Sequence, residues 1–390
     1  MPLQLRPSHI FESVYKAQNG EIVSNRCTFR SLYSPISPTW YFLDRIISNI
    51  GRGAFGTVVK AEDEATGAKV AVKLLHNQDD LHTDIHAERK IYETLVRGSD
   101  PHIYLFAQVL DSGIYRGFNF TVFELCHETM HDVLKGYTGL TPLPSRHIME
   151  IAHQVIAGVK YLHSLGIVHT DIKPNNIALK LSDTTSVYWL DPLTGFHPKK
   201  ILVSTQICIL DLGNAVKIDA NPIHHGRIGT RLYRAPEVVL GLPWSSGVDA
   251  FAVGYVIAEI QGACGLISQA TMNDSEQLAA LEKLIGDFPE SYARRIEEKI
   301  PGTFSFDNDR VAVNFPPYAA ELSAIEFGGA MRRLARMSPL SASRISVVVL
   351  HAGLCDLVSK LMAHDPSARL ELAEAMKHPY FDALRVLQLG

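Results

Sequence analysis

Four polar residues near the middle of the chain have the types and spacing that phosphoryl transfer requires. Asp171, Lys173 and Asn176 lie within one short segment, and Asp211 follows 35 residues after Asn176. A carboxylate can accept the proton of an attacking hydroxyl, a lysine can neutralise the migrating phosphoryl group, and amide and carboxylate oxygens suit Mg²⁺. Taken singly, a loop Asp or Asn is more often a turn or cap residue. The assignment of Asp171 and Lys173 as catalytic, and of Asn176 and Asp211 as metal ligands, therefore depends on the surrounding elements.

A glycine-rich segment precedes these residues. Glycines let a backbone approach phosphates closely, and the β-branched residues on either side favour two strands. A lone GxGxxG pattern could equally indicate a dinucleotide-binding turn, but that turn opens a helix, whereas here residues 57–60 continue as a strand and no βαβ unit follows. The nucleotide-binding candidates in this segment are Ile50, Gly51, Gly53, Gly56 and Val58.

A lysine closes the next apolar strand, Val70-Ala71-Val72-Lys73. Such a lysine is usually an edge residue whose ammonium reaches solvent. Its position after the glycine-rich segment favours a contact with nucleotide phosphates instead, and makes Ala71 a further nucleotide-binding candidate.

The lysine needs an acidic partner on a helix, which we expect over residues 84–95. Glu88 is the predicted partner and joins the nucleotide-binding candidates. Glu93 is the alternative, but it lies five residues further along, is rotated around the helix and is expected on a solvated face.

Three more motifs follow on the C-terminal side, namely Gly229–Glu237, Gly247–Gly254 and His364–Leu370. Together with His169–Asn176 and Asp211-Leu212-Gly213, they resemble the protein kinase superfamily over roughly residues 41 to 383. The resemblance implies an α+β, bilobal protein kinase fold that binds ATP and Mg²⁺ between its lobes. The expected parts are an N-terminal extension over 1–40, a β-rich small lobe over about 41–124 and a mainly helical large lobe over about 128–383.

The same resemblance implies several structural roles. Glu237 would pair with Arg369 in a buried bridge, and Asp249 would begin a central helix and anchor the catalytic loop. Residues 118–126 would form a buried strand that runs into the hinge between the lobes, with Phe123 behind the nucleotide. The hinge backbone at Glu124 and Cys126 would face adenine, which completes the nucleotide-binding candidates.

Within the superfamily, details point to the CMGC group. His169-Thr170-Asp171 and Asp211-Leu212-Gly213-Asn214-Ala215 resemble SR-protein kinases. Residues 230–240, followed by Trp244-Ser245, resemble Clk kinases, and residues 276–286 are similar to the segment that names the LAMMER group without reproducing it. These motifs do not decide between the SR-protein kinase and Clk subfamilies.

Thr170 replaces the arginine that in most kinases receives a phosphorylated activation loop. The segment from Asn214 to Gly229 contains no Ser, Thr or Tyr, and Thr230 lies where contact with Asp171 is expected. We therefore predict an enzyme that is competent without activation-loop phosphorylation.

Lys173, two residues after Asp171, is typical of Ser/Thr kinases. Resemblance implies Arg/Ser-rich protein substrates such as splicing factors, and a net charge of −4 is weakly biased towards basic partners. The alternatives are a catalytically weak pseudokinase scaffold and a small-molecule kinase. Related kinases usually carry a leucine beneath adenine where this chain has Ala178, which is consistent with the scaffold alternative. The intact Ala235-Pro236-Glu237 motif favours a protein substrate over a small molecule.

Composition sets the remaining expectations. The chain has 390 residues, 46% of them hydrophobic, which is enough for two lobes, and no apolar run long enough to span a membrane. Its five cysteines are odd in number and lack CxxC spacing, which favours a reducing compartment, the cytoplasm and/or the nucleus. We expect a monomer without direct nucleic-acid binding.

Two inserts stand out beside the kinase-like motifs. Residues 181–207 carry many turn-forming residues, which predicts a turn-rich insert before Asp211. Residues 262–345 combine an amphipathic helix near 275–286 with a Pro/Gly-containing stretch, where a substrate or partner would dock.

Overall fold

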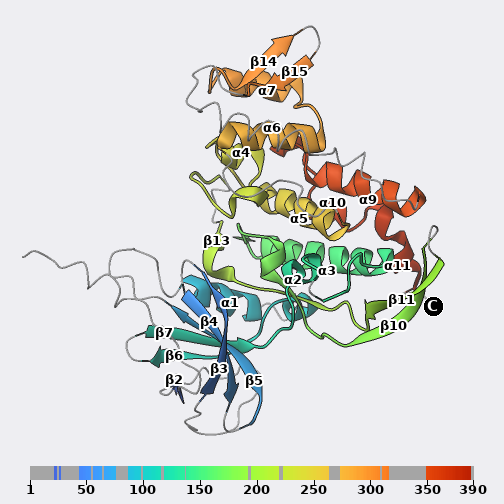
Figure 1. The fold of residues 1–390 in the computed structure, drawn as a ribbon. Coiled ribbons are helices and arrows are strands. Elements are labelled where there is room, and N and C mark those ends of the chain that lie inside the picture. The colour runs from blue at the N-terminus through green and yellow to red at the C-terminus, as the bar shows by residue number, and fades with distance from the viewer. Residues whose placement is uncertain are drawn as a thin grey trace, which may run out of the picture. The chain divides into compact units, whose positions relative to one another are not determined.

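The computed structural model describes most of the chain, and labels below follow Figure 1. The described residues are 22–23, 26–27, 44–53, 56–63, 66–75, 87–97, 100–115, 118–136, 138–191, 195–218, 223–262, 273–307, 310–315 and 348–387. Several predicted parts lie largely or wholly outside these ranges. They are the expected extension over 1–40, the tip of the glycine-rich segment at 54–55, the start of the helix expected over 84–95, and residues 263–272 and 316–345 of the second insert. The chain divides into two compact units, Met1–His127 and Glu128–Gly390.

The first unit is built on an antiparallel sheet whose strands follow the order β1-β3-β4-β5-β7-β6-β2. Buried apolar residues recur at every second position of the central strands, so that one face of the sheet is buried. The strands are β1 (Ile22–Val23), β2 (Arg26–Cys27), β3 (Asp44–Arg52), β4 (Gly56–Asp63), β5 (Lys69–Leu75), β6 (Val109–Tyr115) and β7 (Phe118–Glu124).

A compact apolar cluster holds this sheet together. Its buried members are Ile46, Val59, Ala61, Val70, Val72, Leu74, Phe120 and Val122. Helix α1 (Ala87–Arg97) is joined to the sheet by Tyr92, whose ring lies 5.4 Å from that of Phe123. The sheet and helix thereby fix the position of Lys73 on β5 relative to Glu88 on α1.

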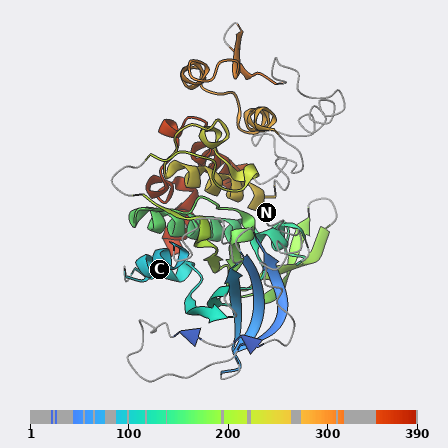
Figure 2. The same ribbon diagram turned by 90° about the vertical axis from the view of Figure 1, so that its left-hand side faces the viewer.

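The second unit is mainly helical, as Figures 1 and 2 show. Its longest helix is α3, and α5 lies in its core with almost every residue buried. The helices are α2 (Met130–Leu134), α3 (Ser145–Ser164), α4 (Pro236–Val239), α5 (Gly247–Ile260), α6 (Asp274–Ile285), α7 (Glu290–Glu297), α9 (Val348–Leu361), α10 (Leu372–Ala375) and α11 (Asp382–Leu387).

Short strand pairs in this unit position the loops beside α3. Strand β8 (Ile167–Val168) pairs with β13 (Val216–Lys217), and β9 (Ile177–Leu179) pairs with β12 (Ile207–Ile209). Because the pairs flank residues 169–176 and 210–215, they hold those two loops next to one another.

The bridge predicted between Glu237 and Arg369 is confirmed. The guanidinium donates to both carboxylate oxygens at 2.7 and 2.9 Å, and to the carbonyls of Ala363 and Gly247. It also lies over the Phe251 ring. The pair therefore ties α4 to the start of α5 and to the segment after α9.

The insert over 181–207 is more regular than its turn-forming residues predict. It forms a hairpin of β10 (Thr184–Asp191) and β11 (Gly195–Leu202), paired in register along both strands. Tyr188 and Phe196 are largely exposed on it. The turn residues mark the ends of the strands, and β-branched and aromatic residues between them favour the extended conformation.

The amphipathic helix expected near 275–286 is α6, which begins after the cap residue Asn273. Together with α7, β14 (Phe304–Asp307) and β15 (Arg310–Val313), it forms a satellite core at the end of this unit away from α3, as Figures 1 and 2 show. No helix within the described ranges is both long and apolar enough to cross a membrane.

Candidate functional site

The first unit contains the ion pair that the sequence predicts between Lys73 and Glu88. The ammonium nitrogen lies 2.9 Å from each carboxylate oxygen, and both side chains are nearly buried. Glu93, the alternative partner, instead accepts from Arg89 one turn earlier on α1. Glu93 therefore lies on the solvated face of the helix, as expected from its position five residues after Glu88. The pair fixes a cationic group at the middle of the sheet.

The glycine-rich segment forms the turn between β3 and β4. Gly53 N–H donates to the carbonyl of Gly56 at 2.9 Å, and Gly53 is exposed with nothing near the position of an added Cβ. At Gly56, by contrast, a Cβ would lie 2.4 Å from the carbonyl oxygen of Leu74. Gly56 is therefore required by the close approach of β4 to β5, a reason that the sequence pattern does not reveal.

The other nucleotide-binding candidates of this unit lie on the same sheet. Ile50 is half exposed on β3, and Val58 and Ala71 are half-buried on β4 and β5. The backbone N–H of Glu124 donates to the carbonyl of Gln108 at 3.0 Å at the end of β7, and Cys126 follows, half-buried.

The second unit brings Asp171, Lys173 and Thr230 into one hydrogen-bonded group. The hydroxyl of Thr230 donates to Asp171 Oδ1 at 2.8 Å and accepts from Lys173 Nζ at 2.8 Å. Lys173 also donates to Asp171 Oδ2 at 2.7 Å, and the Thr230 N–H donates to Oδ1 at 2.8 Å. A hydroxyl oxygen therefore lies within hydrogen-bond distance of both a carboxylate and an ammonium group.

Asn176 is tied to the same loop. Its side-chain nitrogen Nδ2 donates to the carbonyl of Asp171 at 2.9 Å. The side-chain oxygen Oδ1 is therefore the atom of this amide group that can accept hydrogen bonds. Its own carbonyl accepts from the N–H of Leu210, the residue before Asp211. An amide oxygen and a carboxylate, the donor types that Mg²⁺ prefers, thus lie on two segments joined by a backbone hydrogen bond.

His169 adds a second link between these segments. Its Nε2 lies 3.1 Å from the carbonyl of Leu210, and its Nδ1 accepts from the N–H of Asp171 at 3.3 Å. These contacts fix the tautomer with the proton on Nε2. Asp211 itself has a left-handed backbone with φ of 59°, which is uncommon outside glycine and sets its orientation at the turn.

The prediction that Asp249 anchors the catalytic loop is confirmed. One carboxylate oxygen accepts from the N–H of His169 at 2.8 Å and the other from the N–H of Thr170 at 2.8 Å. Asp249 is fully buried in the first turn of α5. Thr170 has a φ of 69°, so this unusual backbone is stabilised by a core helix.

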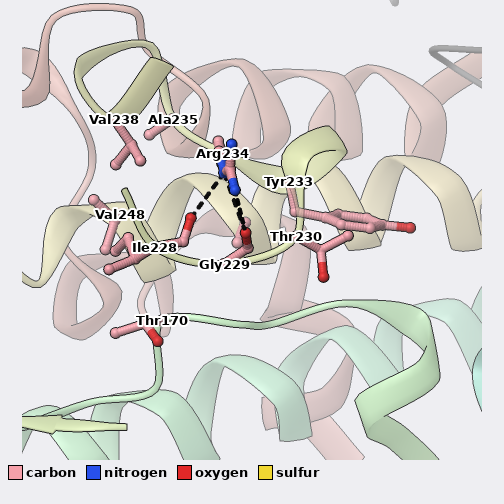
Figure 3. A pocket seen from close by; sticks show the side chains of 10 residues that line it. Thr170, Ile228, Gly229, Thr230, Tyr233, Arg234, Ala235, Val238 and Val248 are labelled. Atoms are coloured by element: carbon pink, nitrogen blue, oxygen red, sulfur yellow. Dashed lines mark hydrogen bonds between the residues drawn. The ribbon is translucent and has the colours of Figure 1, made fainter. Parts of the chain in front are cut away.

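The segment before α4 packs against Thr170. Gly229 has a φ of +66°, and a Cβ there would lie 2.4 Å from the Thr170 carbonyl oxygen. Arg234 donates to the carbonyls of Ile228 and Gly229, as Figure 3 shows. A small pocket opens beside this turn, lined by Thr170, Ile228, Gly229, Thr230, Tyr233, Arg234, Ala235, Val238, Val248 and Ala252.

The segment before α4 also contacts a buried carboxyl group that is not among the residues predicted from the sequence. Glu259, near the end of α5, accepts from the Tyr233 hydroxyl at 2.9 Å. Burial raises the pKa of Glu259 to about 7, and the hydrogen bond from Tyr233 opposes that shift. The raised pKa results from tertiary packing, and no neighbouring residue in the sequence distinguishes Glu259 from an ordinary helix glutamate.

Three comparisons with known proteins agree with this geometry. The family model described as protein kinase domain matches residues 45–381. Human dual specificity protein kinase CLK1 is 32% identical over 347 residues, which are 87% of this chain and 66% of that protein. Dual specificity protein kinase lkh1 of Schizosaccharomyces pombe is 29% identical over 348 residues, 89% of this chain and 48% of that protein.

Serine/threonine-protein kinase Doa of Drosophila melanogaster is 30% identical over 345 residues, 87% of this chain and 39% of that protein. The chain thus spans less than two thirds of the length of these relatives. The crystal structure of the PF14_0431 kinase domain matches with a TM-score of 0.73 and 21% identity, covers 95% of this chain and 99% of that one, and shows the fold alone. The chain belongs to the protein kinase family, has its bilobal α+β fold, and has Clk/LAMMER kinases of the CMGC group among its relatives.

Proposed function

We propose that this chain transfers the γ-phosphoryl group of ATP to serine and threonine hydroxyls of proteins. The observation that carries the proposal is the Thr230 hydroxyl, held 2.8 Å from both Asp171 Oδ1 and Lys173 Nζ. An alcohol oxygen between a carboxylate and an ammonium group is the arrangement that an attacking serine requires. The contacts of Thr230 support the proposal because they show that Asp171 and Lys173 can bind one alcohol oxygen together.

Each candidate residue has a part in this reaction. Asp171 orients the attacking hydroxyl and accepts its proton, and Lys173 stabilises the charge that develops on the transferred group. In the first unit, Lys73 and the backbone of the glycine-rich segment hold the phosphates of ATP, and Glu88 positions Lys73. Adenine is held by the β3–β5 side chains Ile50, Val58 and Ala71 and by the backbone at Glu124 and Cys126.

Asn176 and Asp211 are the residues that would hold magnesium, since their oxygens suit a hard cation. When bound, Mg²⁺ supplies charge neutralisation on the phosphate oxygens. His169 and the hydrogen bond between Leu210 and Asn176 keep the two ligand-bearing segments together.

We also propose that the enzyme works without activation-loop phosphorylation. The Thr170 hydroxyl donates to the carbonyl of Asn214 at 2.8 Å, so this position holds the start of the loop directly. Further along, His224 and Trp244 exchange backbone hydrogen bonds at 2.8 and 2.9 Å, and their rings stack. These contacts supply the order that a phosphate would otherwise provide.

Two experiments test these points. Transfer of ³²P from Mg·ATP to an Arg/Ser-repeat peptide, with Asp211→Ala as the blank, should be robust in the wild type and absent in the variant. A folded wild type that modifies neither this peptide nor basic proteins would indicate a pseudokinase scaffold. For activation, bacterially expressed protein should retain its turnover after phosphatase treatment, and a collapse would contradict independence from phosphorylation.

The choice of serine and threonine rests on Lys173 beside Thr230. Relatives are named as both dual specificity and Ser/Thr kinases, so tyrosine must be tested directly. Matched peptides that differ only in Ser, Thr or Tyr at the acceptor should show transfer to the first two. Comparable transfer to tyrosine would overturn the narrower assignment.

We further infer a monomer that acts on protein substrates in the cytoplasm and/or nucleus and does not bind nucleic acid directly. The five cysteines of the sequence are odd in number and lack CxxC spacing, and the net charge of −4 disfavours binding to a polyanion. Light scattering after gel filtration should give the mass of one chain. A mass of two chains at micromolar concentration would contradict the monomer.

A further inference from the structure

Exposed apolar side chains gather on the β10–β11 hairpin. Tyr188 and Phe196 are the two most exposed large hydrophobic residues in the described part of the chain, at 80% and 70%. Leu181 and Val203, just outside the two strands, are exposed as well. Exposed apolar residues that cluster on one element are typical of an interaction surface, whereas single ones are normal on any protein. The hairpin is therefore a candidate surface for a partner.

The strand register places the exposed residues on one face of the hairpin. Tyr188 pairs with Pro198, and Ser186 pairs with Lys200. Phe196 lies two positions from Pro198 on the same strand, so it points to the same side. All five residues are exposed, and together they form the outward face of the hairpin.

The other face of the hairpin is turned towards the rest of the second unit. Val187, Lys199 and Ile201 on that face are half-buried. The Lys199 ammonium group donates to the carbonyl of Pro142, in the loop before α3. The hairpin is therefore held from its inner side, and its outward face is left to solvent.

The two edges of the hairpin differ in their ability to take up a further strand. β11 carries Pro198, which has no N–H, followed by two lysines, and both features oppose pairing at a sheet edge. β10 has neither a proline nor a charged residue from Thr184 to Leu190. Within the described ranges, β11 is the only strand that pairs with β10, so the outer edge of β10 presents unpaired backbone groups.

The charge of the outward face favours an acidic partner, because Lys200 is its only charged residue. A strand added to β10 would lie two strand spacings, about 10 Å, from β11. Ser186 is small and lies between the two, so a carboxylate opposite Ser186 can reach the Lys200 ammonium group. The residue two positions along the added strand then faces Tyr188.

We propose that β10 binds an extended segment of a partner protein as an additional strand. The segment carries an acidic residue opposite Ser186 and, two positions away, an apolar residue opposite Tyr188. Backbone hydrogen bonds along β10 supply affinity, and Lys200 and Tyr188 select the side chains. The segment is a docking element apart from the phosphorylated residue. The inference therefore goes beyond the proposed function and leaves the Arg/Ser preference at Asp171 unchanged.

The partner is unidentified, so the probe is a displayed library of random peptides selected on the full chain. Peptides of about twelve residues are long enough to cover the eight residues of β10. Selected peptides should share an acidic residue two positions from an aromatic or aliphatic one. Synthetic copies are then measured by fluorescence anisotropy, which needs no turnover.

Two variants test the selecting residues. Lys200→Glu should weaken binding by about tenfold or more, and replacement of the acidic residue of the peptide by lysine should restore it. Tyr188→Ser should weaken binding by at least about fivefold. Lys160→Glu on α3 and Tyr104→Ser change an exposed lysine and an exposed tyrosine elsewhere, and as matched controls they should bind like the wild type. Thermal melts confirm that each variant is folded.

Methylation of the peptide backbone tests the strand pairing itself. The amides of an extended strand point alternately to its two sides, so only every second one can donate to β10. Methylation of one alternate set of amides should therefore weaken binding by about tenfold or more, and methylation of the other set should have little effect.

Selected peptides without the common spacing, equal binding by Lys200→Glu and Lys160→Glu, or insensitivity to both methylations would overturn the inference. Tighter binding of single-stranded RNA than of the peptides would assign the outward face to nucleic acid instead. A mass of two chains that Tyr188→Ser returns to one would assign it to a second copy of this chain. Each of these results concerns binding alone, so the proposed kinase activity would stand.

Discussion

The two lobes each contain a carboxylate paired with a basic side chain, and the two pairs differ in enclosure. Lys73 and Glu88 keep 11% and 13% of their side-chain surface exposed, whereas Arg369 and Glu237 keep 1% and 3%. Arg369 also donates to two backbone carbonyls and lies on the face of Phe251. The fully enclosed pair has all these partners within the fold, and the other pair keeps a small exposed surface that is proposed to face the nucleotide.

We expect the difference in burial to separate a structural pair from a pair that serves the proposed reaction. Removing one partner of an enclosed pair leaves an uncompensated charge in a region without water. Removing one partner of the less enclosed pair leaves a charge that solvent reaches in part, so we expect a smaller loss of stability and a larger loss in the proposed reaction.

The largest effect is expected from Arg369→Met. The variant leaves the Glu237 carboxylate buried without its cation and should lower the free energy of unfolding by about 3–5 kcal/mol. Urea denaturation followed by circular dichroism measures this. Arg146→Met, at an exposed pair, is the control and should cost less than about 1 kcal/mol. A similar loss in both variants would remove the distinction.

Lys73→Met removes one partner of the less enclosed pair, Lys73–Glu88. Without the ammonium group that is proposed to hold phosphates, kcat/KM should fall by about 10²- to 10³-fold, while the unfolding midpoint falls less than in Arg369→Met. Glu88→Gln should lose less, because the lysine remains. Kinetics and thermal melts of the same preparations decide the point, and a destabilisation as large as that of Arg369→Met would contradict it.

Glu259 is another buried carboxylate, and it accepts a hydrogen bond from the Tyr233 hydroxyl. Its pKa rises from 4.5 to about 7, chiefly through burial. Between these values the unfolded chain loses a proton that the folded chain keeps, so the stability due to this group falls as pH rises from about 4.5 to 7.

Glu259→Gln should therefore become more stable relative to wild type over that interval, by at most about 3 kcal/mol at pH 8. Gln can still accept the bond from Tyr233. Unfolding free energies at pH 5 and pH 8 provide the measurement, and a difference that does not vary with pH would exclude the shifted pKa.

The smallest effects concern two glycines of the same turn. Gly56→Ala forces a Cβ against the Leu74 carbonyl and should cost about 1–3 kcal/mol of stability. Gly53→Ala meets open space and should change stability by less than about 0.5 kcal/mol, with its effect confined to the KM for ATP. Equal destabilisation by both changes would show that the turn itself, and not its contact with β5, requires glycine.

The sequence predicted the parts of the molecule that depend on motif spacing. The Lys73–Glu88 and Glu237–Arg369 pairs and the anchor at Asp249 all lie where the motifs place them. The roles of these residues in catalysis stay predictions until they are measured.

Features that depend on tertiary packing could not be predicted in this way. Asp274 accepts hydrogen bonds from Arg227 and Arg231, which lie 47 and 43 residues earlier in the chain, and no local pattern links them. The raised pKa of Glu259 comes from burial, which is a property of the folded core. In the β10–β11 hairpin, turn-forming residues were the stronger local signal, and strand pairing outweighed them.

The contact of Asp249 with the backbone of His169 and Thr170 has a consequence for motion. A loop usually opens locally at little free-energy cost, independently of the helices around it. Here two successive amides are bonded to a carboxylate in the first turn of a buried helix. We expect the segment that carries Asp171 to open only when the first turn of α5 opens with it, so the proposed catalytic residue shares the slow fluctuations of the core.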